Sequence, residues 1–427
     1  MLKKISNNLN KYYIFFILFY GFTYAIVIPP MYHPDEIRHF QKSINNNFFS
    51  KSDEVIITKQ SKSFSETFQA HIKKNPFNSF SINFLLDSKS YIWENEDEKI
   101  IVDTLWQKNY PNINYFFSKI GVEISKLFTN KIIISYYFGK ITNLIFLSLI
   151  IFFSINNLKI NNQLLLLITV MPMTLTLLSS FNQDSTIIVY TFLLIKLTAH
   201  FNYRQYFYTI LFFIILYFLV ISKISNFFFV IIFFIHLLEA KKINLKLGIP
   251  LIIFLYFLIL LHYLSAKEVV DPKNLEYVIN NPFILFKISF SDFLTNFWTY
   301  SVQLVGYLGW INIQVQFWIV IFFILSFFFV IFTNFEITIY KIFILFFIYL
   351  SILITQSVIW IYFSQEHEMF VDSLQGRYFI PMLSLFSLIL VKQNLNHINS
   401  KIKNIILITA PHLNIFSIYK LIAAIYT

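Results

Sequence analysis

Long runs of apolar side chains are the feature that most constrains how this chain folds. An α-helix needs about 20 apolar residues to cross a bilayer, and eleven runs approach that length. Backbone polar groups inside lipid must find partners within their own segment, which favours helices. The sequence therefore predicts an all-α polytopic membrane protein with about eleven transmembrane helices. The runs cover residues 12–28, 132–155, 163–181, 185–200, 205–221, 224–239, 245–264, 314–333, 338–362, 377–391 and 403–423, of which 377–391 is short for a full crossing.

The composition agrees with this class and excludes several others. Hydrophobic residues make up 57% of the 427 residues and charged residues only 13%, far from the average of soluble proteins. Neither a GxGxxG nor a Walker motif occurs, so no nucleotide-binding loop of the usual kind is expected. Cysteine is absent, which excludes disulfides and thiol catalysis.

Basic residues set the expected orientation. The net charge of +11 comes from Lys and Arg scattered among short loops, not from the patch typical of nucleic-acid binding, so no nucleic acid is expected as a partner. Basic residues concentrate in cytoplasmic loops, and a cytoplasmic N-terminus satisfies this rule in nearly every predicted loop. The inside residues are then Lys3, Lys4, Lys11, Lys159, Arg204, Lys241, Lys242, Lys246, Lys341, Lys392, Lys401 and Lys403, opposed chiefly by Glu239 and Glu336. A cleaved signal peptide is the alternative for 12–28, but no small-residue cleavage site precedes the double proline, so a retained helix is expected.

The predicted topology divides the chain into five parts. They are an N-terminal transmembrane helix (1–28), a first extracytoplasmic loop with interfacial helices (29–131), transmembrane helices two to seven (132–264), a second extracytoplasmic loop (265–313) and the C-terminal helices (314–427). In the first loop, 112–128 has the pattern of an interfacial amphipathic helix. In the second, 281–310 is apolar but polar residues interrupt it, so it is either a helix along the outer surface or an additional span.

The stretch HPDEIRHF, residues 33–40, directly follows the first apolar run. Pro34 suits the first position of a helix, and Asp35 and Glu36 suit its first turn, so a well-formed helix start is one interpretation. The other is catalytic, because a carboxylate fixed at the membrane edge, with His39 four residues after Asp35, can take a proton from a bound hydroxyl. The residues alone leave both interpretations open.

Four further residues are unusual for their expected position near the outer surface. Asp184 can cap the helix that follows it. Lys223 can anchor at lipid headgroups or neutralise a lipid phosphate. Arg377 suits a phosphate or an interfacial anchor, and Gly376 before it would let a ligand approach the backbone. Lys140 is expected to face an internal cavity or to pair with an acid such as Asp184.

No motif supports a metal or another cofactor. The HExxH type of spacing does not occur. A divalent cation between Asp35 or Glu36 and a phosphate is chemically reasonable, but no pattern in the sequence indicates one.

Topology limits where an enzyme of this kind can work. The predicted inner loops are too short to fold a domain, so chemistry belongs on the outer face. Nucleotide-activated substrates are not expected outside a bacterial cytoplasmic membrane, and an activated sugar there has to arrive on a lipid. Polyprenyl-phosphate sugars meet this requirement.

An ordered set of motifs resembles a bacterial membrane family of unknown function, domain-of-unknown-function family 2142. The motifs are the double proline with HPDE and His39, then GKITN, PMTLTLLSSFNQDS, SK, GYLGW and QGRYFIP, between about residues 29 and 385. That family is similar in plan to the GT-C glycosyltransferases, multi-span enzymes with an acidic catalytic base in the first outer loop and polyprenyl-phosphate-linked donors. The resemblance implies a base at Asp35 or Glu36 and binding of the donor phosphate by Lys223 and Arg377. Beside it, we expect His39 or Glu36 to assist Asp35, and Lys140, Asp184 and Gln375 are further candidates for substrate binding.

We therefore expect a glycosyltransferase that moves a sugar from a polyprenyl-phosphate donor to a glycan, lipid or protein acceptor among the membrane lipids. A transporter or flippase for lipid-linked glycans is the first alternative, although its polar residues should reach both faces. A non-catalytic partner of polysaccharide assembly is the second.

Overall fold

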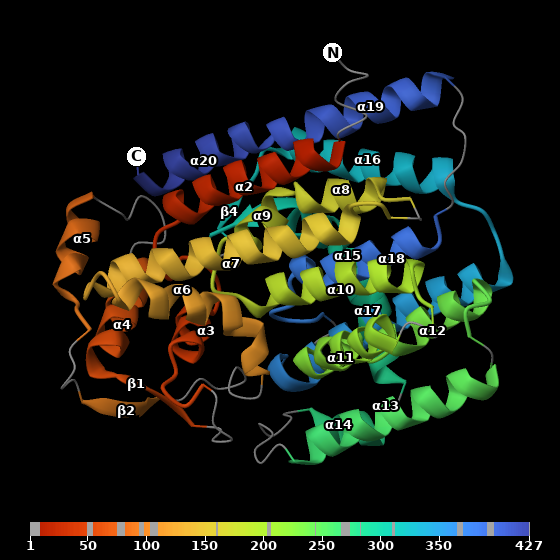
Figure 1. The fold of residues 1–427 in the computed structure, drawn as a ribbon, viewed down its shortest axis with the longest axis horizontal. Helices are drawn as coiled ribbons and strands as arrows, with labels where there is room; N and C mark the ends of the chain where they lie inside the picture. The colour runs from red at the N-terminus through yellow and green to blue at the C-terminus, as the bar shows by residue number, and fades with distance from the viewer. Residues whose placement is uncertain are drawn as a thin grey trace.

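Figure 1 shows the protein as a computed structural model, in which helices dominate. The structure describes residues 9–48, 54–74, 82–93, 98–102, 110–158, 161–202, 206–243, 245–265, 274–281, 283–309, 312–364, 370–390 and 397–426. The bundle helices are α2 (Leu9–Val27), α7 (Ile132–Ile155), α8 (Gln163–Thr169), α9 (Pro172–Leu178), α10 (Gln183–Ala199), α11 (Tyr206–Ser222), α12 (Phe229–Glu239), α13 (Leu245–Ser265), α16 (Phe317–Asn334), α17 (Ile339–Phe363), α18 (Ile380–Leu385), α19 (His397–His412) and α20 (Asn414–Tyr426).

Several of these helices are suited to a membrane by length and composition. Among the described residues, four helical stretches are long and apolar enough to cross one, namely Ile132–Ile155, Phe317–Asn334, Ile339–Phe363 and Ser400–Tyr426. Shorter apolar helices occupy Tyr206–Ser222, Phe229–Glu239 and Gly248–Leu260. An all-α membrane protein is thereby confirmed, whereas the count of eleven spans stays a prediction.

Two of the predicted spans are broken helices. The run 163–181 contains Pro172, which cannot donate a backbone hydrogen bond, and the chain forms α8 and α9 in place of one helix. The short run 377–391 forms η5 (Gly376–Phe379), α18 and η6 (Phe386–Leu388), three single-turn or two-turn pieces.

Polar contacts sort the helix termini into two groups. At one end, Asn10 donates to Asn156, and Lys242 donates to the carbonyl oxygen of Thr198. At the other, Tyr426 donates to the carbonyl oxygen of Val27, 2.9 Å away. We call the end at which α2, α9, α11 and α17 terminate the long-loop end, because both long connections lie there, and the opposite end the short-loop end.

The first long loop folds against the long-loop end. Its elements are α3 (Glu36–Ser43), β1 (Val55–Thr58), α4 (Lys59–Lys74), α5 (Ile82–Asp87), η1 (Ser88–Ser90), β2 (Lys99–Val102), η3 (Asn112–Tyr115) and α6 (Phe116–Lys126). β1 and β2 pair antiparallel, with Val55 opposite Val102. Phe40, Phe64 and Phe68 are fully buried beneath them. The helical pieces agree with the sequence-based expectation, which did not include the hairpin because each strand has only four residues.

The predicted amphipathic helix 112–128 corresponds to η3 and α6, which lie along α7. Gly121 makes the contact close, because a Cβ there would lie 2.7 Å from the carbonyl oxygen of Phe138. The large apolar side chains of Leu127 and Phe128 are 85% and 59% exposed. Leu127 and Phe128 follow the helix, whose own Val122 is fully buried, and the place of this helix at a membrane surface stays a prediction.

The second long loop contains α14 (Leu275–Asn280), α15 (Ile284–Gly306) and a small hairpin of β3 (Tyr307–Leu308) and β4 (Ile313–Gln314). Before α14, the Asn274 amide donates to the carbonyl oxygens of Trp360 and Ser364 at the end of α17. After α15, the Asn312 amide donates to Tyr32. Both ends of α15 thus lie at the long-loop end, and its place along an outer membrane surface stays a prediction.

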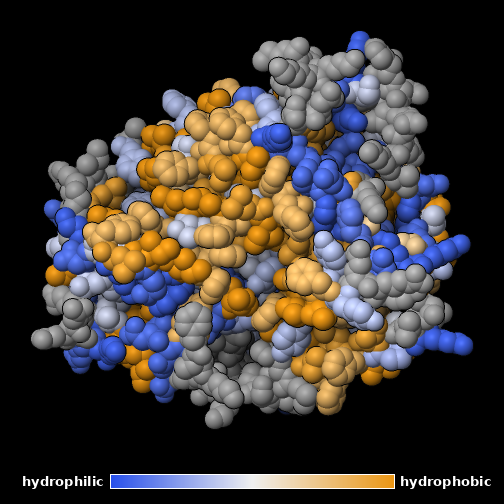
Figure 2. Space-filling view, viewed as in Figure 1, coloured by the Kyte–Doolittle hydropathy of each residue, from blue (hydrophilic) through white to orange (hydrophobic). Residues whose placement is uncertain are grey.

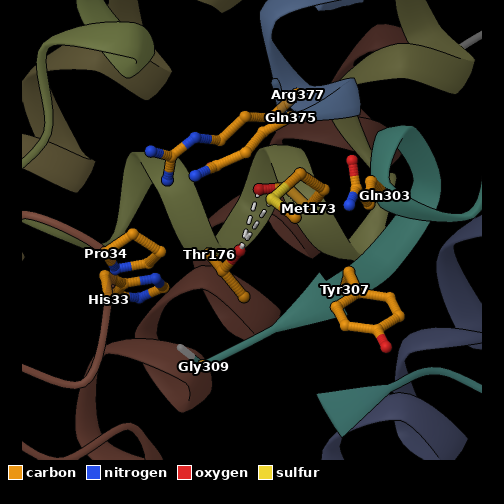
Figure 3. Close-up of a pocket in the computed structure, with 9 residues that line it drawn as sticks. All are labelled: His33, Pro34, Met173, Thr176, Gln303, Tyr307, Gly309, Gln375 and Arg377. Atoms are coloured by element: carbon orange, nitrogen blue, oxygen red, sulfur yellow. Dashed lines mark hydrogen bonds between the residues drawn. The ribbon is translucent and has the colours of Figure 1, made fainter. Parts of the chain in front are cut away.

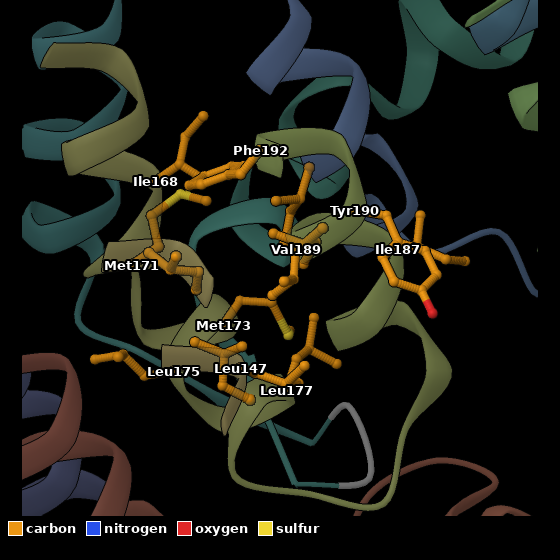
Figure 4. Close-up of a cluster of buried hydrophobic side chains, with 14 of the residues drawn as sticks. Leu147, Ile168, Met171, Met173, Leu175, Leu177, Ile187, Val189, Tyr190 and Phe192 are labelled. Carbon is orange, nitrogen blue, oxygen red and sulfur yellow. The ribbon is translucent and has the colours of Figure 1, made fainter. Parts of the chain in front are cut away.

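The outside and the core of the bundle are both apolar. Figure 2 shows an apolar band over α2 and α7, where Phe15, Phe19 and Phe153 are more than half exposed, while hydrophilic side chains gather over the first long loop. Inside, α8, α9 and α10 are buried on nearly all sides. Figure 4 shows Leu177 of this unit beside Leu147 of α7, and Phe192 of α10 beside Ile168 of α8. This packing fixes the start of α10 at the long-loop end.

Candidate functional site

The chain turns sharply between α2 and α3, and Asp35 lies at this turn. Met31 and Asp35 both have a left-handed backbone, with φ of 62° and 61°, a conformation that is costly for side chains other than Gly, Asn and Asp. Asp35 precedes the helix as its N-cap residue but makes no capping hydrogen bond. The interpretation of Asp35 as a first-turn residue is therefore wrong by one position, and its half-buried carboxylate is not used for capping.

Glu36 has a structural role. Its side chain is fully buried, and its carboxylate accepts hydrogen bonds from the backbone N–H groups of His33 (3.3 Å) and Phe181 (3.2 Å) and from Tyr136. Burial raises the pKa of this carboxyl, although the Lys140 charge and these hydrogen bonds act in the opposite direction. Glu36 ties the start of α3 to the turn between α9 and α10.

Lys140 lies beside Glu36, and we call the contacts of these two residues the brace. Its ammonium donates to the carbonyl oxygen of Ile28 (3.2 Å) and lies 5.4 Å from the centre of the Tyr136 ring. The expected pairing with Asp184 is not found, since the ion pairs of Asp184 are with other residues.

Asp184, Lys223 and Arg377 form a buried cluster that we call the ion-pair cluster. The Lys223 Nζ lies 2.7 Å from Asp184 Oδ1, and the Arg377 Nε lies 3.4 Å from Asp184 Oδ2. Burial alone would raise the pKa of the Asp184 carboxyl, but the Lys223 and Arg377 charges outweigh it and hold this pKa below its ordinary value. Two interpretations are thereby corrected. Asn182, not Asp184, caps α10, and Lys223 points into the protein instead of anchoring at headgroups.

Three separate elements bring these charges together. Asp184 is in the first turn of α10, Lys223 follows α11 directly, and Arg377 is in η5. The Asn114 amide donates to Ser222 Oγ (2.9 Å) and to Gln183 (3.4 Å). This bridge fixes the end of α11 against the start of α10.

Tyr378 covers the cluster, and sequence reasoning missed it. The Lys223 Nζ lies 3.7 Å from the centre of its ring, and the Arg377 Cζ lies 5.4 Å from the same point. A ring face at such distances attracts cations. The only available signal was its position next to Arg377 in the QGRYFIP motif.

His39 lies at the side of the cluster, between two tyrosines that sequence reasoning also missed. Its Nδ1 is 2.6 Å from Tyr115 Oη, and its ring stacks on that of Tyr110. Burial, together with the Arg377 and Lys223 charges, lowers the pKa of His39 to about 4, although Asp35 and Asp184 act in the opposite direction. His39 is thus neutral at pH 7, and both carboxylates act on its ring.

Gly376 serves packing and not ligand approach, contrary to the sequence-based interpretation. A Cβ at this position would lie 2.1 Å from the carbonyl oxygen of Tyr300 in α15. The Gly376 N–H donates to Gln303 Oε1 (2.8 Å). Because Gly376 has no side chain, η5, which contains Arg377, packs directly on α15.

A cavity of about 290 Å³, including space open to solvent, adjoins the cluster. Figure 3 shows Arg377 and Gln375 on one side of it and His33 and Pro34 on another. The Nε2 of His33 and the Oε1 of Gln375 are buried and make no hydrogen bond to the residues that the structure describes. The lining residues are His33, Pro34, Met173, Thr176, Gln303, Tyr307, Gly309, Gln375 and Arg377.

The structure thus places Asp35, His39, Asp184, Lys223 and Arg377 around one region and Gln375 in the adjoining cavity, while Glu36 and Lys140 form the brace behind Asp35. Within the described part of the chain, no three His, Asp or Glu side chains are grouped as metal ligands would be. A divalent cation, which no pattern in the sequence indicated, has no defined ligand set among these residues.

A helical bundle with several apolar helices, and with most of its described buried charges at one end, defines a multi-pass membrane protein. The chain belongs to the family described as predicted membrane protein (DUF2142), whose model matches residues 18–386. No curated protein and no solved structure is significantly similar to it.

Proposed function

We propose that this protein is a membrane glycosyltransferase that uses a polyprenyl-phosphate-linked sugar, with its active site at the long-loop end. The observation that carries the proposal is the ion-pair cluster beside Asp35. In the proposed orientation the N-terminus is cytoplasmic, and the long-loop end faces outward from a bacterial cytoplasmic membrane. The acceptor is a glycan, lipid or protein of the cell envelope.

The charges of the cluster suit a lipid phosphate. Lys223 and Arg377 share one carboxylate, that of Asp184, so the three groups together carry one excess positive charge. Arginine binds phosphate oxygens with its planar fork, and lysine supplies a point charge. An anionic headgroup at this position would complete the neutralisation.

Asp35 is the better candidate for the base. The Glu36 oxygens already accept two backbone hydrogen bonds, whereas Asp35 makes no capping bond. Its left-handed backbone, which Asp adopts more readily than most residues, turns the chain sharply before α3. His39, neutral at pH 7 and held by Tyr115, is a positioning residue beside it.

The proposed reaction is a single displacement. Asp35 accepts the proton of the acceptor hydroxyl as the acceptor oxygen forms a bond to the anomeric carbon. The bond from that carbon to the phosphate oxygen breaks, and polyprenyl phosphate leaves with the electron pair. Lys223 and Arg377 stabilise the charge on the departing phosphate, the kind of preorganised help that lowers a barrier by about 3 kcal/mol per donor. The sugar centre is inverted.

The test is transfer by the purified full-length protein in nanodiscs. Undecaprenyl-phosphate donors carrying radiolabelled glucose, mannose, galactose or N-acetylglucosamine are offered with cell-envelope extract as acceptor. We expect transfer from at least one donor, and a loss of about 10²- to 10⁴-fold in Asp35→Asn because general base catalysis is removed.

Asp87→Asn is the matched control, because Asp87 is an exposed aspartate at the end of α5. Its transfer rate should equal that of the wild type. Full activity of a folded Asp35→Asn protein would refute the assignment of the base. Movement of the lipid-linked sugar across the membrane without transfer would support the flippase alternative, and neither activity would support a non-catalytic partner.

A further inference from the structure

We infer that one face of α15 inserts into the lipid leaflet at the long-loop end, so that this helix lies in the membrane surface and does not cross the bilayer. The inference does not depend on the proposed function, because it concerns only how the protein contacts lipid. The face consists of six large apolar side chains, which we call the α15 stripe, namely Phe283, Phe286, Phe290, Leu294, Phe297 and Trp298.

The α15 stripe follows the period of an α-helix. Its members recur every three or four residues, which places them on one side of the helix, and their side chains are 43–85% exposed. The opposite side carries Asp292 and Tyr300, both buried, and Asp292 accepts hydrogen bonds from Gln356 of α17 and from the backbone N–H of Val371. One side of α15 thus packs on the protein, and the other is open among the described residues.

The α15 stripe continues onto a helix that is suited to cross a membrane. The rings of Trp298 and Phe317 lie 5.4 Å apart between their centres, and both are exposed. From Phe317 onward, α16 presents further exposed side chains at helical spacing, among them Phe328 and Phe332. Since α16 is long and apolar enough to span a bilayer, lipid that surrounds it also reaches the α15 stripe.

This contact also sets the depth of the stripe. Phe317 is the first residue of α16, and α16 begins at the long-loop end, so Trp298 lies at the level where α16 enters the membrane. Trp318 is exposed at the same level. Tryptophan is enriched at the membrane–water interface. The α15 stripe therefore belongs at the boundary between headgroups and acyl chains.

α15 has the length of a spanning helix but not its placement. Its 23 residues extend over about 34 Å. The chain before it is tied to the end of α17 through Asn274, and the hairpin after it leads to the start of α16. Both of these helix termini lie at the long-loop end. A helix that begins and ends at one side of the bundle cannot cross the bilayer.

The composition of this face favours lipid over water. Between residues 283 and 298 the charged residues are Lys287 and Asp292, and Asp292 is buried on the other side. The long stem of an exposed lysine can carry its ammonium group to the headgroups. A contiguous set of large exposed apolar side chains marks an interaction surface, and its continuity with α16 identifies acyl chains as the partner.

The lipid contact connects the membrane surface to the ion-pair cluster. Gly376 of η5 packs directly on Tyr300 and Leu304 of α15, and Arg377 is the next residue. A helix held in the leaflet by one side and packed on η5 by the other fixes Arg377 near the level of the headgroups.

The test measures the depth of single fluorophores in the full-length protein. Because the chain contains no cysteine, one cysteine can be introduced at a time. Each variant is labelled with bimane and reconstituted into nanodiscs of phosphatidylcholine and phosphatidylglycerol. Lipids with a nitroxide at the headgroup, high in the acyl chain or low in it quench a label according to its depth. The variants are Phe286→Cys, Phe290→Cys, Leu294→Cys and Phe297→Cys.

We expect one common depth for all four labels, about 5–10 Å into the boundary between headgroups and acyl chains. Two control positions calibrate the measurement. A label at Phe328→Cys should be quenched most by the deep nitroxide, because it lies about 16 Å further along α16 than Phe317. A label at Lys59→Cys in the first long loop, where the side chain is 65% exposed, should be quenched by none of the lipids.

Three results would overturn the inference and leave the proposed function untouched. Depths that increase along the helix, by about 16 Å between positions 286 and 297, would mean that α15 crosses the bilayer. Labels that behave like the one at Lys59→Cys would mean that the stripe faces water. Labels in apolar surroundings that no lipid quenches would mean that a protein surface covers the stripe.

Discussion

The Nζ of Lys223 lies 2.7 Å from the Oδ1 of Asp184, although the two residues are 39 positions apart in the chain. Arg377 approaches the other oxygen of the same carboxylate from η5. One carboxylate thus holds two cations that would otherwise repel each other in a buried place. The cluster therefore contributes to stability as well as to the proposed phosphate site.

Asp184→Asn should reduce the free energy of unfolding by about 3–5 kcal/mol, because removal of one partner leaves buried charges uncompensated. Thermal unfolding in detergent, followed by intrinsic tryptophan fluorescence, measures the change. Glu98→Gln is the control, because Glu98 pairs with Lys59 and the two side chains are 68% and 65% exposed. Exposed pairs contribute about 0–1 kcal/mol. Equal losses in the two variants would contradict the argument.

The length of the apolar runs predicted individual helices, but the sequence did not reveal which charged residues would form ion pairs. The run 132–155 coincides with α7, because length and composition alone decide such a helix. Asp184, Lys223 and Arg377 were recognisable as unusual charges near one surface. That they share one carboxylate depends on the packing of α10, α11 and η5, which no local pattern encodes. For the same reason the different roles of the neighbours Asp35 and Glu36 appeared only in three dimensions.

Asp292 holds the segment that leads to Arg377 and allows a test of how this arginine is positioned. Its buried carboxylate accepts hydrogen bonds from Tyr300 (2.6 Å), Gln356 (3.0 Å) and the backbone N–H of Val371 (3.0 Å). It therefore holds the segment before η5 against α15 and α17. Asp292→Ala leaves these donors without a partner and should cost at least about 3 kcal/mol of unfolding free energy, since bonds to charged groups contribute about 1.5–3 kcal/mol each.

The measurement for Asp292 is thermal unfolding together with undecaprenyl phosphate binding, which should weaken because Arg377 is displaced. Asp292→Asn keeps an acceptor oxygen and should fall between the wild type and Asp292→Ala. Asp372→Asn changes an exposed aspartate of the same segment and should be nearly neutral. A stable Asp292→Ala protein with unchanged lipid affinity would show that Asp292 does not position the segment.

His39 should make the protein sensitive to mild acid. Its pKa is about 4 in the folded protein and near its ordinary value of about 6.5 when unfolded. Since the unfolded state takes up the proton first, the contribution of His39 to stability is fully present above pH 6.5 and is lost as the pH falls toward 4. The loss amounts to about 3 kcal/mol.

The His39 prediction is checked by unfolding midpoints of the wild type and of His39→Asn, which cannot titrate, at intervals from pH 7.5 to 4. The difference between the two proteins should shrink or reverse in favour of the variant as the pH decreases, because only the wild type must protonate a buried imidazole. Parallel curves for the two proteins would mean that another group causes the acid sensitivity.

Substituting two glycines by alanine compares two effects: Gly376 tests close packing, and Gly248 tests helix propensity. Gly376→Ala places a Cβ 2.1 Å from the carbonyl oxygen of Tyr300 and 2.7 Å from the backbone nitrogen of Leu304, and backbone atoms cannot rotate away. η5 must therefore move off α15, at a cost of at least about 1–3 kcal/mol, and Arg377 moves with it.

At Gly248 in α13, the nearest atom to an added Cβ is the flexible end of Ile243 at 3.4 Å. Gly248→Ala should instead stabilise the helix by about 0.5–1 kcal/mol. Thermal unfolding and undecaprenyl phosphate affinity distinguish the two, because the same chemical change should lower both quantities at 376 and lower neither at 248. Similar behaviour of the two variants would mean that η5 does not depend on this contact.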